Sequence, residues 1–114
     1  MRQLNDTIIP AQSGASGATS NAVNAENLFN ISAIAISGGT EVGTLKLQAS
    51  NDTPTAANAV PTNWADIPSA TVSVTTGAVV LIPKTDICYQ WIRAVYTHTS
   101  GTGTITVIIK ALGA

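Results

Sequence analysis

The stretch Gly43-Thr-Leu-Lys-Leu-Gln-Ala-Ser-Asn51 alternates apolar and polar side chains without a break. Leu45, Leu47 and Ala49 would face one side of an extended chain, and the polar residues between them would face the other. A period of two is the geometry of a β-strand that buries one of its faces. This stretch therefore predicts a strand that covers a core on one side.

The same extended pattern recurs along the rest of the chain. In residues 28–37 the apolar residues fall on both faces, so that we expect Ile34 and Ile36 to be covered as well as the opposite face. Further stretches of short strand character are residues 63–67, 70–76, 79–82, 89–97 and 104–112.

Glycine-containing turns between these stretches suggest how the strands pair. Gly77 predicts a tight hairpin between residues 70–76 and 79–82, and the turn at 100–103 predicts antiparallel pairing of the last two strands. No segment has a helical period, and no long crossover connects parallel strands. The sequence predicts an all-β fold, a single antiparallel β-sandwich, jelly-roll-like, of about seven or eight short strands.

The first part of the chain has a different composition. Residues 11–20 are rich in Gly, Ser and Ala, and such a segment does not pack well by itself. We therefore expect residues 1–27 to form an extended N-terminal segment with a flexible arm, and residues 28–114 to form the sandwich domain. The arm would reach a neighbouring subunit, and its candidate interface residues are Ser13, Gly14, Ser16 and Gly17.

Length and charge limit the function classes. The 114 residues suffice for one domain, and only 10% of them are charged, against about 25% in a typical protein. The formal net charge is −1, without a basic stripe, which argues against nucleic-acid binding. No apolar run reaches the length of a membrane span, so no membrane contact is expected. A sparsely charged, nearly neutral surface favours self-association, and we expect a homo-oligomer.

The sequence contains few residues of the types that commonly act in catalysis. His98 is the single histidine and Cys88 the single cysteine, so no internal disulfide is expected. His98 beside the 100–103 turn suggests a solvated loop residue, and Cys88 suggests a small buried apolar residue. An enzyme would need one of them to meet a carboxylate in a pocket. We expect no enzyme, no catalytic residues, no cofactor and no metal site.

Four aromatic side chains remain as candidates for recognition or for the core: Trp64, Tyr89, Trp91 and Tyr96. Tyr96 is expected in the core, whereas Trp64 is a candidate ligand-binding aromatic residue. Trp91 and Arg93 share one strand face and form a candidate interface. The alternative, equally supported, is that Arg93 simply lies against Trp91 and pairs with a neighbouring carboxylate.

Four segments carry a resemblance to a known group of proteins: Gly43-Thr-Leu-Lys-Leu-Gln-Ala-Ser-Asn-Asp52, Asn63-Trp-Ala-Asp-Ile-Pro68, Ile87-Cys-Tyr-Gln-Trp-Ile-Arg-Ala-Val-Tyr-Thr97 and Ser100-Gly-Thr-Gly-Thr-Ile-Thr-Val-Ile-Ile-Lys110. Together they resemble small structural proteins of tailed and other bacteriophages, over roughly residues 28–113. The layout also resembles a reduced discoidin-like jelly roll.

This resemblance implies a virion protein made in the host cytoplasm, whose partners are the major capsid protein or other virion proteins. The short chain favours a small capsid decoration or minor capsid protein. The alternative is a carbohydrate- or host-receptor-binding β-sandwich module of a phage tail or spike. The resemblance carries no binding site over to this chain.

Overall fold

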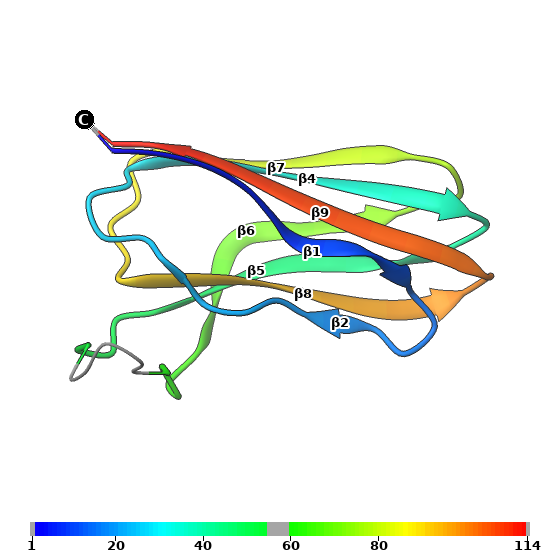
Figure 1. Ribbon diagram of the computed structural model, residues 1–114, viewed down its shortest axis with the longest axis horizontal. Helices are drawn as coiled ribbons and strands as arrows, with labels where there is room; N and C mark the ends of the chain where they lie inside the picture. The colour runs from blue at the N-terminus through cyan, green and yellow to red at the C-terminus, as the bar shows by residue number, and fades with distance from the viewer. Residues whose placement is uncertain (1, 55–59, 114) are drawn as a thin grey trace.

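A computed structural model describes residues 2–54 and 60–113 of the chain. Within these residues the protein is all-β, with two antiparallel sheets packed face to face (Figure 1). The strands are β1 (Gln3–Ser13), β2 (Ala18–Thr19), β3 (Val23–Asn24), β4 (Asn30–Gly39), β5 (Val42–Ser50), β6 (Ala65–Val74), β7 (Val79–Lys84), β8 (Trp91–Ser100) and β9 (Gly103–Leu112).

The strand order is that of a jelly roll. Sheet A has the order β1-β9-β4-β7, and sheet B has the order β2-β8-β5-β6, with β3 also paired to β8. Figure 1 shows the two sheets stacked along their length, with β1 and β9 side by side from the chain ends inward. The predicted single antiparallel sandwich is therefore confirmed.

The core lies between the sheets and follows the period of two. Leu45, Leu47 and Ala49 of β5 are buried as predicted, and so are Ile31, Ala33 and Ala35 of β4. Ile105, Val107 and Ile109 of β9 are also buried, beside the β4 residues in the same sheet. Tyr96 of β8 is 2% exposed and is one of the largest side chains of the core, which confirms its predicted role.

The pairing of consecutive strands differs from the prediction. The chain crosses from one sheet to the other at the β4–β5, β6–β7 and β8–β9 turns, so β7 pairs with β4 and β9 pairs with β4 and β1. The predicted hairpin around Gly77 and the predicted pairing of the last two strands are wrong. A glycine with positive φ, such as Gly77 at 65° or Gly101 at 80°, permits a sharp turn but does not decide which sheet receives the next strand.

The N-terminal segment also differs from the prediction. Residues 3–13 form β1, an edge strand of sheet A that pairs with β9, and residues 18–19 and 23–24 pair with β8. The sandwich therefore begins at residue 3 rather than at residue 28. Two register shifts interrupt β1, and most of its side chains are exposed, so its sequence lacks a clear alternation.

A further difference concerns Pro68. The sequence suggests a short strand that ends there, but β6 continues through it from Ala65 to Val74. The continuation requires an irregularity, since Ser69 has a positive φ of 57° and the register with β5 shifts between Lys46 and Gln48. Proline is tolerated at such a position because β6 is the edge strand of sheet B.

Candidate functional site

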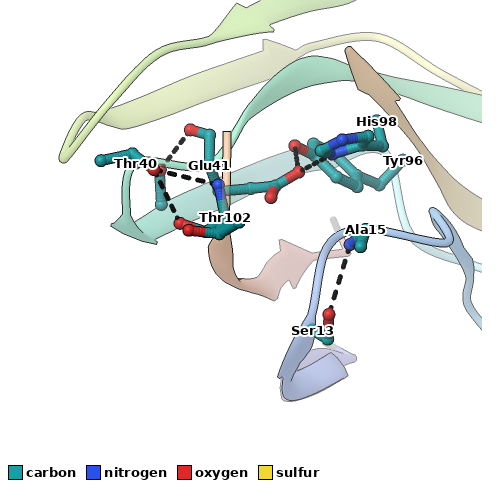
Figure 2. Close-up of polar contacts among 8 residues, drawn as sticks. Ser13, Ala15, Thr40, Glu41, Tyr96, His98 and Thr102 are labelled. Carbon is teal, nitrogen blue, oxygen red and sulfur yellow. Dashed lines mark hydrogen bonds and ion pairs between the residues drawn. The ribbon is translucent and has the colours of Figure 1, made fainter. Parts of the chain in front are cut away.

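A buried polar cluster lies at the end of the sandwich where the β1–β2, β4–β5 and β8–β9 turns meet. Glu41 is fully buried just after β4, and its side chain points between the sheets towards Tyr96 and His98 (Figure 2). The Tyr96 hydroxyl donates a 2.6 Å hydrogen bond to Glu41 Oε1, and His98 Nδ1 lies 2.6 Å from the same oxygen. These three residues are called the Glu41 cluster below.

Burial and hydrogen bonding act in opposite directions on the Glu41 carboxyl. Desolvation raises its pKa. The hydrogen bonds from Tyr96 and His98, together with the charge of His98, lower the pKa by more than desolvation raises it, so the pKa lies below its ordinary value. Desolvation and the hydrogen bond to Glu41 raise the pKa of Tyr96. Glu41 Oε2 has no hydrogen-bond partner among the described residues, so all the polar contacts of the carboxylate fall on one oxygen.

The loop after β1 closes over this cluster. Gly14 is buried there, and a Cβ atom on it would overlap the side-chain carboxyl of Glu41, so a larger residue would displace that carboxyl. Gly14 N donates to Gly103 O at 3.1 Å, and the Ala15 N–H lies 3.4 Å from Ser13 Oγ (Figure 2). The loop that contains Ser13, Gly14, Ser16 and Gly17 is therefore folded against its own chain, held by the backbone bonds of Gly14 and Gly17. Ser13 and Ser16 are exposed, which leaves the predicted contact with a neighbour as a prediction.

His98 does not have the position expected from its sequence neighbours. It belongs to β8 rather than to a solvated loop, and its side chain is 25% exposed. Its exposed side borders a hollow of about 370 Å³ lined by residues 15–19 and 96–98. The expectation of a solvated loop histidine is wrong because the strand continues to Ser100 and the pairing with Gly43 turns His98 towards Glu41.

The Glu41 cluster thus contains part of what acid–base chemistry needs. A carboxylate on Nδ1 can orient an imidazole, but nucleophilic catalysis also needs a nucleophile within hydrogen-bonding reach of that ring. Among the described residues, no hydroxyl or thiol is hydrogen-bonded to His98, and no group of three His, Cys, Asp or Glu residues could hold a metal. Cys88 lies between β7 and β8 and is exposed rather than buried, contrary to the sequence expectation.

The second candidate region is the outer face of sheet B, where polar side chains form a connected row. Arg93 lies over the ring of Trp64, 4.3 Å from its centroid, and donates from Nε to Gln48 Oε1 at 2.8 Å. Gln48 Nε2 in turn donates to Asp66 Oδ1 at 2.9 Å, and Lys46 Nζ lies 3.2 Å from the same oxygen. The hydrogen bond from Gln48 is the largest cause of the lowered pKa of Asp66, followed by Lys46. These five residues are called the sheet B row.

The contacts of Arg93 differ from the alternative in which it lies against Trp91 and pairs with a carboxylate, and the interface of Trp91 and Arg93 stays a prediction. Arg93 stacks on Trp64 rather than on Trp91, and its partner is an amide oxygen rather than a carboxylate. Trp91 is half-buried at the start of β8 and donates from Nε1 to Asp52 O at 3.0 Å. Trp64 is also half-buried and donates from Nε1 to Pro61 O at 3.1 Å. Both indoles are partly exposed, with their polar atoms satisfied inside the chain.

Asp52 organises the loop beside these tryptophans. Its Oδ2 accepts hydrogen bonds from the Thr62 and Asn63 N–H groups at 2.7 and 3.1 Å, and its Oδ1 accepts from Asn63 Nδ2 at 2.8 Å. The bond from the Asn63 side chain is the largest of the causes that lower the pKa of Asp52. Asp52 therefore acts as a loop cap, the role expected for an aspartate at this place.

The third region is an apolar patch on the outer face of sheet A. Leu81, Ile34 and Ile108 are neighbours in one cross-strand row over β7, β4 and β9. Val79 and Ile36 precede them in the next row. Val79 is 58% exposed and Leu81 57%, while the three isoleucines are half-buried. These five residues are called the sheet A face. The expectation that Ile34 and Ile36 are fully covered is not met within the described chain.

The sequence predicts only part of the sheet A face. The pattern of residues 28–37 places Ile34 and Ile36 on a second apolar face of their strand. Val79 and Leu81 lie in a run of four apolar residues, in which periodicity cannot separate inner from outer positions. Glu41 is not among the predicted site residues, although it is in phase with the inward residues Leu45 and Leu47.

Comparison of the chain with protein families, with curated proteins and with solved structures finds no match in any of the three. Within the described residues, no helix is long and apolar enough to cross a membrane.

Proposed function

We propose that this protein is a structural subunit that acts through protein–protein contacts, as a small capsid decoration or minor capsid protein of a bacteriophage virion. Its partners would be the major capsid protein or other virion proteins, together with further copies of itself. The observation that carries the contact role is the sheet A face. Contiguous exposed apolar surface is typical of interaction sites rather than of a free monomer.

The virion assignment has separate support. It comes from the likeness of residues 43–52, 63–68, 87–97 and 100–110 to small bacteriophage structural proteins. The jelly-roll order of the two sheets is compatible with it, since viral capsid domains use this architecture. The same architecture occurs in lectin domains, so the fold alone does not decide the role.

The experiment that tests this proposal is co-sedimentation of the tagged chain with particles purified from cells that carry the gene. The wild-type chain is expected to sediment with the particles at a constant ratio to their coat protein. Val79→Glu places a charge on the sheet A face and is expected to release it. Val60→Glu is the matched control, because Val60 is 78% exposed and lies outside that face. A wild-type chain absent from particles would contradict the proposal.

The second candidate function is a carbohydrate- or host-receptor-binding module that uses Trp64 or Trp91. The partial exposure of both indoles favours it, since an exposed ring can stack on a sugar. Against it, Arg93 occupies one face of the Trp64 ring. Binding on a glycan array that Trp91→Ala abolishes would support this function. Absence of glycan binding, combined with particle association, would leave the structural role.

A further inference from the structure

The free edge of β7 offers backbone groups in a defined direction. Within the described chain, β4 is the only strand that pairs with β7. The Ser37 N–H donates to Ala78 O at 3.0 Å, so the carbonyl group of residue 78 points towards β4. Backbone direction alternates along a strand, and the N–H and C=O groups of Val79 and Leu81 therefore point away from β4.

Pro83 has the same direction as Val79 and Leu81. Proline lacks an N–H group, and on an edge strand it is accommodated where that group would face solvent. The outward edge of β7 therefore presents two N–H groups, from Val79 and Leu81, and it lacks a donor at residue 83. A second strand can pair fully only with the Val79–Leu81 part of this edge.

The other edge of sheet A is built differently. β1 contains two register shifts, and Asp6 and Pro10 lie within it. Bulges, charges and prolines are features that protect an edge from further pairing. The register of β7 with β4 has no such shift from Val79 to Lys84. The two edges thus differ in their readiness to pair, and β7 is the open one.

We propose that β7 pairs antiparallel with β7 of a second copy of this chain about a two-fold axis at Val80. This inference rests on the proposed function, because it names the first partner of the sheet A face. In this register Val79 lies opposite Leu81 of the other copy, and each pair exchanges two backbone hydrogen bonds. Shifting the axis to Leu81 would place Pro83 opposite Val79 and leave the Val79 carbonyl without a donor.

Side chains and charge favour the same partner. The pairing joins the row of Val79 and Ile36 to the row of Leu81, Ile34 and Ile108 in the other copy. The sheet A face becomes continuous across the axis. Lys110 is the charged side chain on the outer face of β4, β7 and β9, and it lies beyond the Ile108 row, away from the axis. Two copies therefore meet without like charges at their contact.

The proposed register can be tested with cysteines in a Cys88→Ser background. Val80 faces its own symmetry copy as a non-hydrogen-bonded pair, in which Cα atoms are about 4.5 Å apart, within the range of a disulfide. Val80→Cys is expected to give a disulfide-linked dimer on mild oxidation. Val79→Cys is the matched control and should remain unlinked, because Val79 faces Leu81 rather than Val79 of the other copy. Cross-linking of Val79→Cys without Val80→Cys would overturn the register.

Light scattering of the unmodified chain tests the dimer without any substitution. The expected mass is twice 11.6 kDa at high concentration, falling to 11.6 kDa on dilution. Leu81→Pro removes an outward N–H and no bond to β4, and should weaken the dimer by about tenfold or more, while Leu81→Val keeps the N–H and the dimer. A mass that stays at 11.6 kDa, or that grows beyond two copies, overturns the inference.

These outcomes separate the two proposals. A chain that associates with particles but remains monomeric in solution would sink the β7 pairing and leave the structural role. A chain that dimerises through Val80 but never associates with particles would contradict the structural role in a virion and leave the β7 pairing.

Discussion

The outer faces of the two sheets differ in how far contacts within the chain cover their exposed side chains. On sheet B, the polar groups of the row from Lys46 to Arg93 satisfy one another within the chain. On sheet A, Val79 and Leu81 remain more than half exposed, and no contact within the described residues covers them. The comparison teaches that a sheet face can be completed by its own side chains or left to be completed by a partner.

The magnitudes favour sheet A as the contact surface. Burying a Val or Leu side chain fully contributes about 1.5–3 kcal/mol, whereas an exposed ion pair contributes about 0–1 kcal/mol. A partner that covers the sheet A face removes apolar area from water, while a partner on sheet B would have to displace contacts that already exist. Substitutions in the Glu41 cluster are expected to have the largest effect, those on the sheet A face a smaller one, and those in the sheet B row the smallest.

The largest effect is expected from disrupting the Glu41 cluster, which is buried between the two sheets. Glu41→Ala deletes the acceptor of the buried Tyr96 hydroxyl and leaves a cavity beneath Gly14. The free energy of unfolding should fall by about 2–5 kcal/mol, as for other losses of a buried side chain and its hydrogen bonds. Urea unfolding measures it, with the exposed Glu26→Ala as control. Equal stability of the two variants would show that the Glu41 cluster does not hold the sheets together.

The same cluster predicts how stability depends on pH. The pKa of Glu41 is lower in the folded chain than in the unfolded chain, so its contribution is present above the unfolded pKa of about 4.3 and is lost as the pH falls through the folded pKa. Glu41→Gln should therefore flatten the loss of stability below about pH 4. Unfolding midpoints measured between neutral and acidic pH provide the test. Parallel curves for wild type and variant would contradict it.

The next effect compares the two faces directly with matched substitutions. Val79→Thr makes the β7 edge of the sheet A face polar, and Val95→Thr does the same on the outer side of β8 in sheet B. Val79→Thr should weaken self-association by about tenfold, or about 1.4 kcal/mol, because the apolar contact of Val79 with Leu81 of the other copy is reduced. Val95→Thr should leave it unchanged. Sedimentation equilibrium measures both, and an equal loss in the two variants would erase the difference between the faces.

A smaller effect is expected within the sheet B row. Arg93→Lys keeps the charge but loses the planar stacking on Trp64 and the Nε bond to Gln48. The folded chain should lose about 0.5–1 kcal/mol without any change in association. Thermal unfolding and light scattering measure the two quantities. Weaker association in this variant would show that sheet B is also a contact surface.

The smallest effect is expected at Asp66. The lowered pKa of this exposed carboxylate means that its pairing with Gln48 and Lys46 stabilises the fold above the unfolded pKa and is lost as the pH falls through the folded one. Asp66→Asn should therefore lower the melting temperature slightly at neutral pH and not at all in acid. High salt should shrink the difference further. A difference that persists in acid or in high salt would contradict a screened surface contact.

The sequence predicted the elements well where one face of a strand is buried. The alternation of Leu45, Leu47 and Ala49 could only fit a half-buried strand, and it located β5 to within a residue. It could not predict the sheet that each strand joins, because the turns at Gly77 and Gly101 suit a hairpin and a crossing between sheets equally. β1 was misjudged because an exposed edge strand with bulges has little alternation.

The candidate regions were predictable in part. Trp64 and Arg93 were singled out as separate residues, but their stacking depends on the return of the chain through β6, which local sequence does not specify. Glu41 meets His98 through strand pairing over a separation of 57 residues in sequence. Such a contact has no local signature. The inward phase of Glu41 with Leu45 and Leu47 was the only available hint.

The most direct test of the central claim is hydroxyl-radical footprinting of the concentrated chain against the dilute chain, read out at single residues. The sheet A face is expected to be protected on association, with oxidation of Val79 and Leu81 falling severalfold while Val60 and the sheet B tryptophans keep their rates. Unchanged oxidation of Val79 and Leu81 in the associated chain would contradict the claim, and so would protection confined to Trp64 and Trp91.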